Sequence, residues 1–276
     1  MSLRNFTHRL SGCRVSPGSS PVILTTTALA VAATTTFGEW LLSDLVGSPV
    51  QLLGFVIVTT TVLLGRRARW AVVLGVLGAG TLFVGTTVAA MEAFSALVAS
   101  VVCSQLWAER HGDPEWRAWS LRYLGTAVVT SLTVGTALAW LTDLLGTVSF
   151  LVSWSSVVSM NLPAAVVGLP VAWALVVLGN ESAWDGPHTA ASPRTRLSIS
   201  VVVVCWAAIG TGLSGFVYFV RLASAETLGR RLHVVVELIG RLAVANESRI
   251  QFVVGIAALV VMFVLHSRNQ PADRTD

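Results

Sequence analysis

Long apolar runs, separated by short polar or basic stretches, dominate this chain. They fall at about 21–38, 50–65, 70–107, 123–142, 162–179, 197–220 and 250–266. Most are close to the roughly 20 residues that a helix needs to cross a bilayer, and all are longer than the roughly ten residues of a barrel strand. Because a helix satisfies its own backbone hydrogen bonds in lipid, the pattern predicts an all-α, polytopic membrane protein.

The run over 70–107 is too long for one crossing. Gly85 and Glu92 interrupt its middle and arginines flank both of its ends, so we expect a hairpin of two helices and eight spans in total. Arginine prefers the cytoplasmic side of a membrane. Threading the chain on that rule places both termini in the cytoplasm and predicts a multi-pass protein of the cell membrane.

Composition narrows the function. Hydrophobic residues make up 54% of the chain and charged residues 12%. The chain has no lysine, which excludes Schiff-base chemistry of the retinal type. The net charge of +4 comes from arginines at span ends, so we expect no nucleic-acid partner. The cysteines and histidines show no metal-binding spacing, and we predict neither a metal site nor a cofactor.

The predicted organisation has five parts. A cytoplasmic flank covers 1–20, although its arginines and the apolar run from Pro21 leave a cleaved signal peptide as an alternative to a retained first helix. A six-helix core covers 21–180, a cytoplasmic linker 181–196, two further spans 197–267 and a cytoplasmic tail 268–276.

For two segments the sequence allows more than one position relative to the membrane. Residues 143–161 are polar and broken, so we expect them to lie at the outer surface or to re-enter the membrane, with Asn161 as N-cap of the next helix before Pro163. Residues 222–245 form an amphipathic pattern. That helix is predicted to lie on the outer leaflet, with extension of the seventh span and pairing with a partner chain as alternatives.

Small residues indicate where helices approach closely, since lipid gives no hydrophobic force between helices. Gly75 with Gly78, Ser131 with Gly135, and Gly210 with Ser214 are such pairs. The threonine triplets at 25–27, 34–36 and 59–61 are expected to bond back to carbonyl groups of their own helices.

Chemistry is predicted at the outer ends of the first five spans, where four carboxylates fall in loops without arginine. Such groups in a cleft would attract an amine, another organic cation or a hard metal ion, and nearby indoles offer cation–π contact. The alternative is that the outer loops are acidic only for solvation. The candidate substrate-binding residues are Glu39, Trp40, Asp44, Glu92, Trp140, Asp143, Trp154 and Asn161.

The core over 21–180 resembles the substrate-binding S subunits of energy-coupling-factor vitamin transporters. Three passages support the resemblance: "LLGRRARWAVVLGVLGAG" (63–80), "ALAVA" (28–32) and "NLPAAVVGLPVAWAL" (161–175). It implies a vitamin-like molecule captured under the first outer loop (39–49), a coupling subunit pressed against the "ALAVA" patch and a separate ATPase module. The two spans beyond residue 180 depart from that family.

The leading hypothesis is therefore a transporter or substrate-capture subunit for a small molecule, cationic or vitamin-like, embedded in the lipid bilayer. The rival is a membrane sensor or scaffold that acts through its amphipathic helix. An intramembrane serine protease is a third reading, based on Gly212-Leu-Ser214-Gly215. The chain is not otherwise predicted to be an enzyme.

Overall fold

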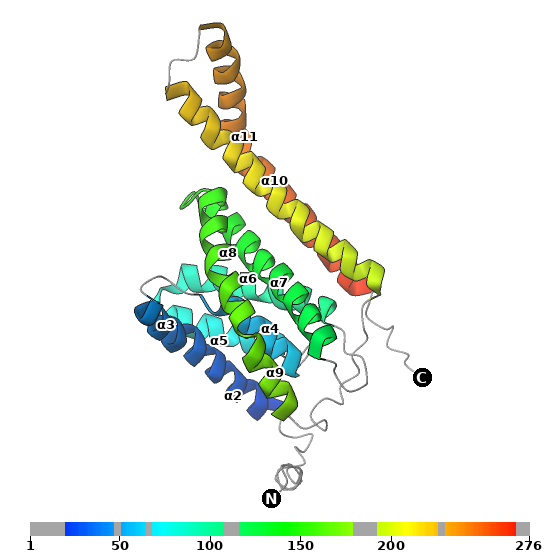
Figure 1. Ribbon diagram of the computed structural model, residues 1–276. Coiled ribbons are helices and arrows are strands. Elements are labelled where there is room, and N and C mark those ends of the chain that lie inside the picture. Colours follow the sequence, from blue (N-terminus) through cyan, green and yellow to red (C-terminus); the bar gives the residue numbers. More distant parts are fainter. Residues whose placement is uncertain are drawn as a thin grey trace, which may run out of the picture.

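The computed structural model describes residues 20–46, 51–64, 68–107, 116–178, 192–225 and 230–268, and these residues form helices joined by turns (Figure 1). Of the predicted parts, the flank up to residue 19, the linker over 181–191 and the tail over 269–276 lie outside the described residues. The all-α prediction is confirmed for the part of the chain that is described.

The helices of the first half are α2 (Ser20–Ala33), a π-helix η2 (Thr34–Gly38), α3 (Glu39–Val46), α4 (Leu53–Leu64), α5 (Ala68–Phe83) and α6 (Thr86–Leu106). They are followed by α7 (Trp116–Leu144), α8 (Phe150–Val167), α9 (Leu169–Leu178), α10 (Pro193–Ala225) and α11 (Arg230–Arg268).

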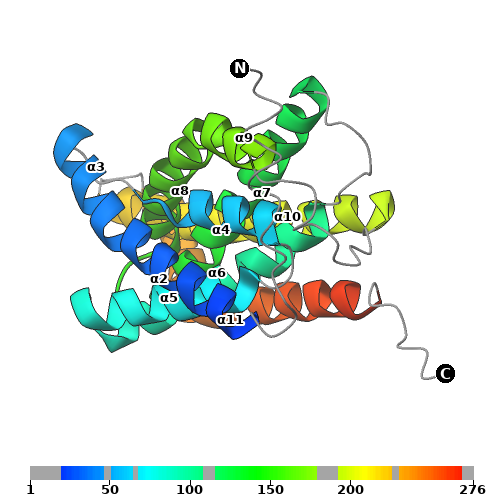
Figure 2. The ribbon, with the colours of Figure 1, turned by 90° about the horizontal axis from the view of Figure 1, so that it is seen from below.

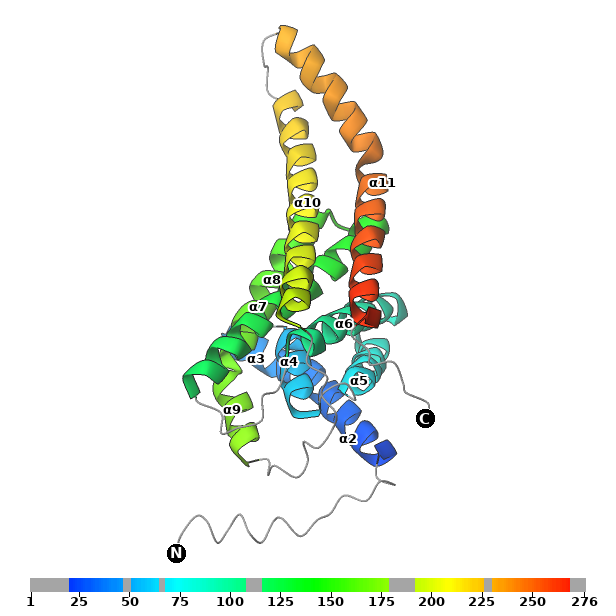
Figure 3. The same cartoon turned by 90° about the vertical axis from the view of Figure 1, so that its right-hand side faces the viewer.

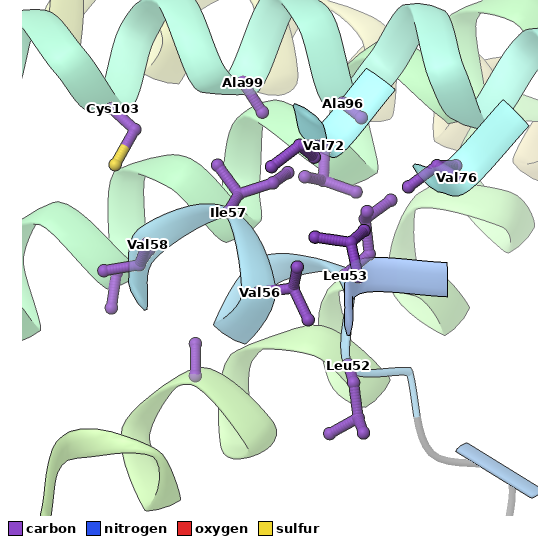
Figure 4. Close-up of a cluster of buried hydrophobic side chains, with 14 of the residues drawn as sticks. Leu52, Leu53, Val56, Ile57, Val58, Val72, Val76, Ala96, Ala99 and Cys103 are labelled. Carbon is purple, nitrogen blue, oxygen red and sulfur yellow. The ribbon is translucent and has the colours of Figure 1, made fainter. Parts of the chain in front are cut away.

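Helix α4 lies at the centre of the first bundle. It contacts α5, α6, α7, α8 and α9, and the view from below shows it between the α2/α5 pair and the α7/α8 pair (Figure 2). Its apolar side chains pack against α5 and α6, where Ile57, Val72 and Ala99 are fully buried (Figure 4). A second cluster joins α6 and α7 to the α10/α11 hairpin through Trp140, Phe150 and Trp206.

Five helices of the described part are long and apolar enough to span a membrane: Thr86–Leu106, Trp116–Leu144, Phe150–Val167, Pro193–Val220 and Asn246–Arg268. The outer surface agrees with that reading, since Leu82, Phe83 and Phe263 are at least 70% exposed while Ser100, Thr130 and Asn161 are 0% exposed. Large apolar side chains on the outside of a helical bundle are typical of contact with lipid.

The predicted hairpin within 70–107 is confirmed. Helices α5 and α6 turn at Gly85, whose φ of 117° is a conformation that side-chain-bearing residues rarely adopt. The amide groups of Val84 and Gly85 both donate to the carbonyl oxygen of Gly80, at 2.9 Å each. Gly85 therefore allows the chain to reverse its direction between α5 and α6 within two residues.

The prediction that the polar segment over 143–161 is broken is wrong from Phe150 onward. Helix α8 begins at Phe150, continues through Asn161 and Pro163, and ends at Val167. The serines do not interrupt it, because Ser155 and Ser159 donate to carbonyl groups of their own helix, at 3.1 and 2.8 Å. The break comes instead at Gly168, before α9.

The segment 222–245, predicted as one surface helix, is divided. Residues up to 225 complete α10, and 230–245 form the first part of α11, which continues into the last apolar stretch. At 33 and 39 residues, the two helices extend well past the ends of α7 and α8 (Figure 3). Helices of these lengths span about 50 to 60 Å, more than the roughly 30 Å of the hydrocarbon core of a bilayer.

The hairpin meets the bundle at Gly210, where a methyl group would come within 2.4 Å of the Phe150 ring. We expect Gly210→Ala to lower the free energy of unfolding in detergent by about 1–3 kcal/mol, because the fully buried ring has no room to shift. Gly212→Ala is the matched control, since a methyl group there meets nothing within 4 Å. Equal melting temperatures for the two variants would contradict this packing.

Candidate functional site

Two side chains from distant parts of the chain hold the beginning of α4. The amide of Leu52 donates to Oε1 of Glu39 at 2.7 Å, and the amide of Gly54 donates to Oδ1 of Asn161 at 2.8 Å. The first amides of a helix have no partner within the helix, so these contacts satisfy them. A carboxylate at this end is also favoured by the helix dipole.

Asn161 does not cap its own helix, so that prediction is wrong. It lies inside α8, and it is fully buried against α4. Its Nδ2 donates to Oε1 of Gln51 at 2.6 Å and to the carbonyl oxygen of Val157 at 3.0 Å. One amide therefore joins α8 to the residues that begin α4.

A widened helical turn precedes Glu39. Residues Thr34–Gly38 form a π-helix, and the hydroxyl groups of Thr34, Thr35 and Thr36 bond back to carbonyl groups one turn earlier, as predicted. One extra residue per turn changes the direction in which the following side chains point. The π-turn thus sets the face of the helix from which Glu39 reaches Leu52.

Glu39 and Glu92 form a pair of carboxyl groups at this end of the bundle. Burial raises the pKa of Glu39 to about 7, the hydrogen bond from Leu52 opposes the rise, and repulsion from the Glu92 carboxylate adds to it. Glu39 lies just beyond the first predicted span. Two of the four predicted carboxylates are therefore near enough for the charge of one to act on the other.

The stability of the protein should depend on the protonation of Glu39. A carboxyl group whose pKa is raised on folding stabilises the fold fully below its ordinary value of 4.5, and this contribution is lost as the pH rises towards 7. The melting temperature in detergent should therefore decrease as the pH rises from about 4.5 to about 7, and Glu39→Gln should make this decrease smaller. Asp44→Asn, on an exposed residue of the same helix, serves as the control. An unchanged slope in Glu39→Gln would contradict the burial of this group.

Asp143 lies elsewhere. Its Oδ1 accepts a hydrogen bond from the amide of Phe150 at 3.1 Å, so it holds the beginning of α8 after the turn at Gly146. No contact between it and the Glu39–Glu92 pair is among the interactions of the described residues.

The predicted tryptophans take different positions. Trp140 is buried and donates from Nε1 to the carbonyl oxygen of Gln251 at 2.9 Å, and Trp154 donates to Oγ1 of Thr136 at 3.2 Å. Both join helices. Trp40 is 64% exposed and packs on Phe37, with ring centroids 5.9 Å apart. The structure thus brings Glu39, Glu92 and Asn161 to the region where α4 begins, and it places Trp140, Asp143 and Trp154 between α7, α8 and α11.

Three side-chain amides were not predicted from the sequence, and two of them, Gln105 and Gln251, are buried. Gln51 contacts Asn161, Gln105 contacts His266 at the far end of α6, and Gln251 donates to the carbonyl oxygen of Gly210 at 3.1 Å. Each amide stands in or beside an apolar run. A polar residue inside a membrane helix is costly unless it is paired, and this signal would have singled out all three.

The protease reading finds no support around Ser214. Its hydroxyl oxygen accepts a hydrogen bond from the amide of Leu151 at 3.3 Å and lines a cavity of about 230 Å³ with Tyr218 and Glu247. His266 lies near the C-terminal end of α11 and contacts Gln105 and Arg69 instead of Ser214. Among the described residues, no three histidine, cysteine or acidic side chains are grouped to hold a metal ion.

Comparison with protein-family models, with curated proteins and with solved structures gives no match for this chain. The fold and the site therefore define only a class. In its described part the chain is an all-helical protein with several helices of membrane-spanning length and a polar site where its central helix begins.

Proposed function

We propose that this protein is an integral membrane transporter, or the substrate-capture subunit of one, for a small organic cation. The observation that carries the proposal is the Glu39 carboxyl group, which bonds to the Leu52 amide at the beginning of α4 at 2.7 Å and lies within electrostatic reach of Glu92; these two groups are called the Glu39–Glu92 pair. Two carboxyl groups in a partly desolvated cleft bind one positive charge more readily than they hold two negative charges. The absence of arginine from the loops predicted at that end supports the same sign of charge.

The proposal includes eight crossings of the cell membrane with both termini in the cytoplasm. The crossings are α2, α4, α5, α6, α7, α8 with α9, α10 and α11. Helices α2, α4 and α5 are short for this task, and the crossing by α2 gains length from its continuation through η2, which ends at Gly38.

Helix α4 is the element that would respond to the substrate. Glu39 bonds to the amide of Leu52, so a cation that engages this carboxylate competes with the contact that holds α4. Because α4 packs against five other helices, a change at its first turn reaches most of the bundle. Binding outside would in this way be coupled to rearrangement inside.

A coupling subunit and an ATPase module remain part of the proposal. Within the patch at 28–32, the Ala28 carbonyl and the Val31 side chain face Gly75 of α5, whereas Leu29 and Ala30 are exposed. A partner would therefore meet the exposed side of α2.

Thermal shift with defined cations tests the proposal. The purified protein should melt at a higher temperature in ethylammonium or tetramethylammonium chloride than in sodium chloride of equal ionic strength, because a ligand that binds only the folded state stabilises it. Glu39→Gln and Glu92→Gln should lose the shift. Asp143→Asn should keep it, since Asp143 serves α8. No shift with either cation, or a shift that survives in Glu92→Gln, would refute the proposal.

A second candidate is a sensor or scaffold that acts through α10 and α11, favoured by the extension of these helices past the bundle (Figure 3). Deleting residues 222–245 should then abolish capture of a partner chain in a crosslinking experiment while cation binding is unchanged. Capture that persists after the deletion would exclude this function.

A further inference from the structure

Four hydroxyl groups lie in the middle of the helical core. Thr61 is on α4, Ser100 on α6, and Thr130 and Ser131 on α7; each residue is at most 1% exposed. Their hydroxyl oxygens are buried and have no oxygen or nitrogen partner among the described residues; Thr61 and Thr130 bond to the thiol of Cys103 instead. We call these four residues the hydroxyl seam.

The four residues are close to one another. Thr61 and Thr130 lie beside the thiol of Cys103, and Ser100 is three residues before Cys103, on the same face of α6. Ser131 follows Thr130, and its Oγ is 3.0 Å from the position that a β-carbon on Gly54 would occupy. Three helices therefore direct hydroxyl groups into one strip.

The seam differs from most of the threonines and serines whose hydrogen bonds the structure describes. Thr34, Thr60 and Ser95 each donate to a carbonyl group of the preceding turn, at 2.6 to 2.8 Å, which is the usual way to satisfy a hydroxyl in an apolar helix. A buried hydroxyl without a partner costs about 1–3 kcal/mol. Ser100 and Ser131 carry this cost in full, while Thr61 and Thr130 have only a weak sulfur partner, and such a cost is typical of residues kept for function.

The seam begins at the site proposed above. Ser131 faces Gly54, whose amide is held by Asn161, and Asn161 also contacts Gln51, next to the Leu52 amide that Glu39 accepts. In the other direction, α7 leads to Tyr123 and Trp119, whose rings stack with centroids 5.3 Å apart. Trp119 also packs edge-on against Trp107 and Trp173. The seam therefore runs from a pair of carboxyl groups to a group of aromatic rings, both of which attract cations.

We propose that the hydroxyl seam is the route along which a small ammonium-type cation passes between the Glu39–Glu92 pair and the aromatic rings around Trp119. This inference rests on the proposed function and adds the path to it. Each hydroxyl can donate and accept, so a file of them replaces the hydration shell of a small cation in steps. Because the four residues are at most 1% exposed, a primary ammonium group, which is smaller than a quaternary one, is the cargo expected on this route.

Cys103 reports on this route without a transport assay. In the variant Cys13→Ser/Cys205→Ser, membranes are treated with a methanethiosulfonate that carries an ethylammonium group, and the rate of Cys103 modification is measured by mass spectrometry. The matched control has Ala99→Cys and Cys103→Ser in the same background. Ala99 is equally buried, one turn away on α6 in the same cluster, and lies close to the apolar side chains of Ile57 and Val72 (Figure 4), whereas Cys103 also has Thr61 and Thr130 beside it.

We expect Cys103 to react at least about tenfold faster than the cysteine at 99, because only the seam offers the ammonium group hydrogen-bonding partners. Thr61→Val and Thr130→Val, which keep the side-chain shape, should slow the reaction at Cys103 several-fold. The reagent with a trimethylammonium group should react slowly at both positions. Equal rates at 103 and 99, or rates unaffected by the valine variants, would overturn the route.

The result is separable from the proposed function. If Cys103 is labelled as expected but no cation gives a Glu92-dependent thermal shift, the route stands and the carboxylate binding site is refuted. If the thermal shift is present but Cys103 is labelled no faster than the control, the binding site stands and the route is wrong.

Discussion

Replacing Asn161 by alanine is expected to lower the free energy of unfolding in detergent by about 3 kcal/mol, a large effect for one polar side chain. The substitution removes the acceptor for the Gly54 amide and both donor contacts, to Gln51 and Val157. A buried amide at the first turn of α4 is then left without a partner. Since α4 is the centre of the first bundle, its loosening reaches the packing of α5, α6 and α7.

Ser159→Ala is the matched control for Asn161→Ala. Ser159 stands two residues earlier on α8, is exposed, and bonds only within its own helix. Its replacement should change the free energy of unfolding by less than about 0.5 kcal/mol. Melting of both variants in the same detergent gives the comparison, and an equally small effect for Asn161→Ala would show that α4 does not depend on this contact.

The helical class followed from the lengths of the apolar runs, because run length is a property of the sequence alone. The α5/α6 hairpin followed from Gly85, since a glycine between two apolar stretches of helical length marks a turn. These features are local, and local features are the ones that a single sequence specifies.

Other elements depended on contacts that no local pattern shows. The serines over 149–159 led to the prediction of a broken helix. In the structure, serines such as Ser155 bond to carbonyl groups of their own helix, so α8 continues through them. Asn161 before Pro163 fits the pattern of a helix start. Its amide instead serves a helix 107 residues away in the sequence. Tertiary hydrogen bonds therefore decided the placement of this segment.

The candidate site was predicted as four carboxylates at one mouth. Charge at the outer ends of spans can be read from the sequence, but convergence depends on which helices pack together. Glu39 and Glu92 come within electrostatic reach of each other because α2 and η2 both lie against α5, which is joined to α6 by a tight hairpin. Asp143 lies in the last turn of α7 and bonds to the beginning of α8, and the spacing of carboxylates along the chain does not distinguish it from Glu39 and Glu92.

Replacing Gly75 by alanine is expected to separate α2 from α5, with a loss of about 2–4 kcal/mol in the free energy of unfolding. A methyl group at 75 would come within 2.5 Å of the carbonyl oxygen of Ala28 and 2.8 Å of Cβ of Val31. The first obstacle is backbone, which cannot rotate away, so α2 as a whole must shift.

Gly78, three residues further along α5, provides the control: a methyl group there meets nothing within 4 Å, and alanine favours a helix by up to about 1 kcal/mol over glycine. Gly78→Ala should therefore melt at or above the temperature of the unmodified protein, while Gly75→Ala melts well below it. Because α2 continues into Glu39, Gly75→Ala should also weaken the thermal shift by ethylammonium, and a normal shift in a destabilised Gly75→Ala would show that the position of Glu39 is independent of the α2–α5 contact.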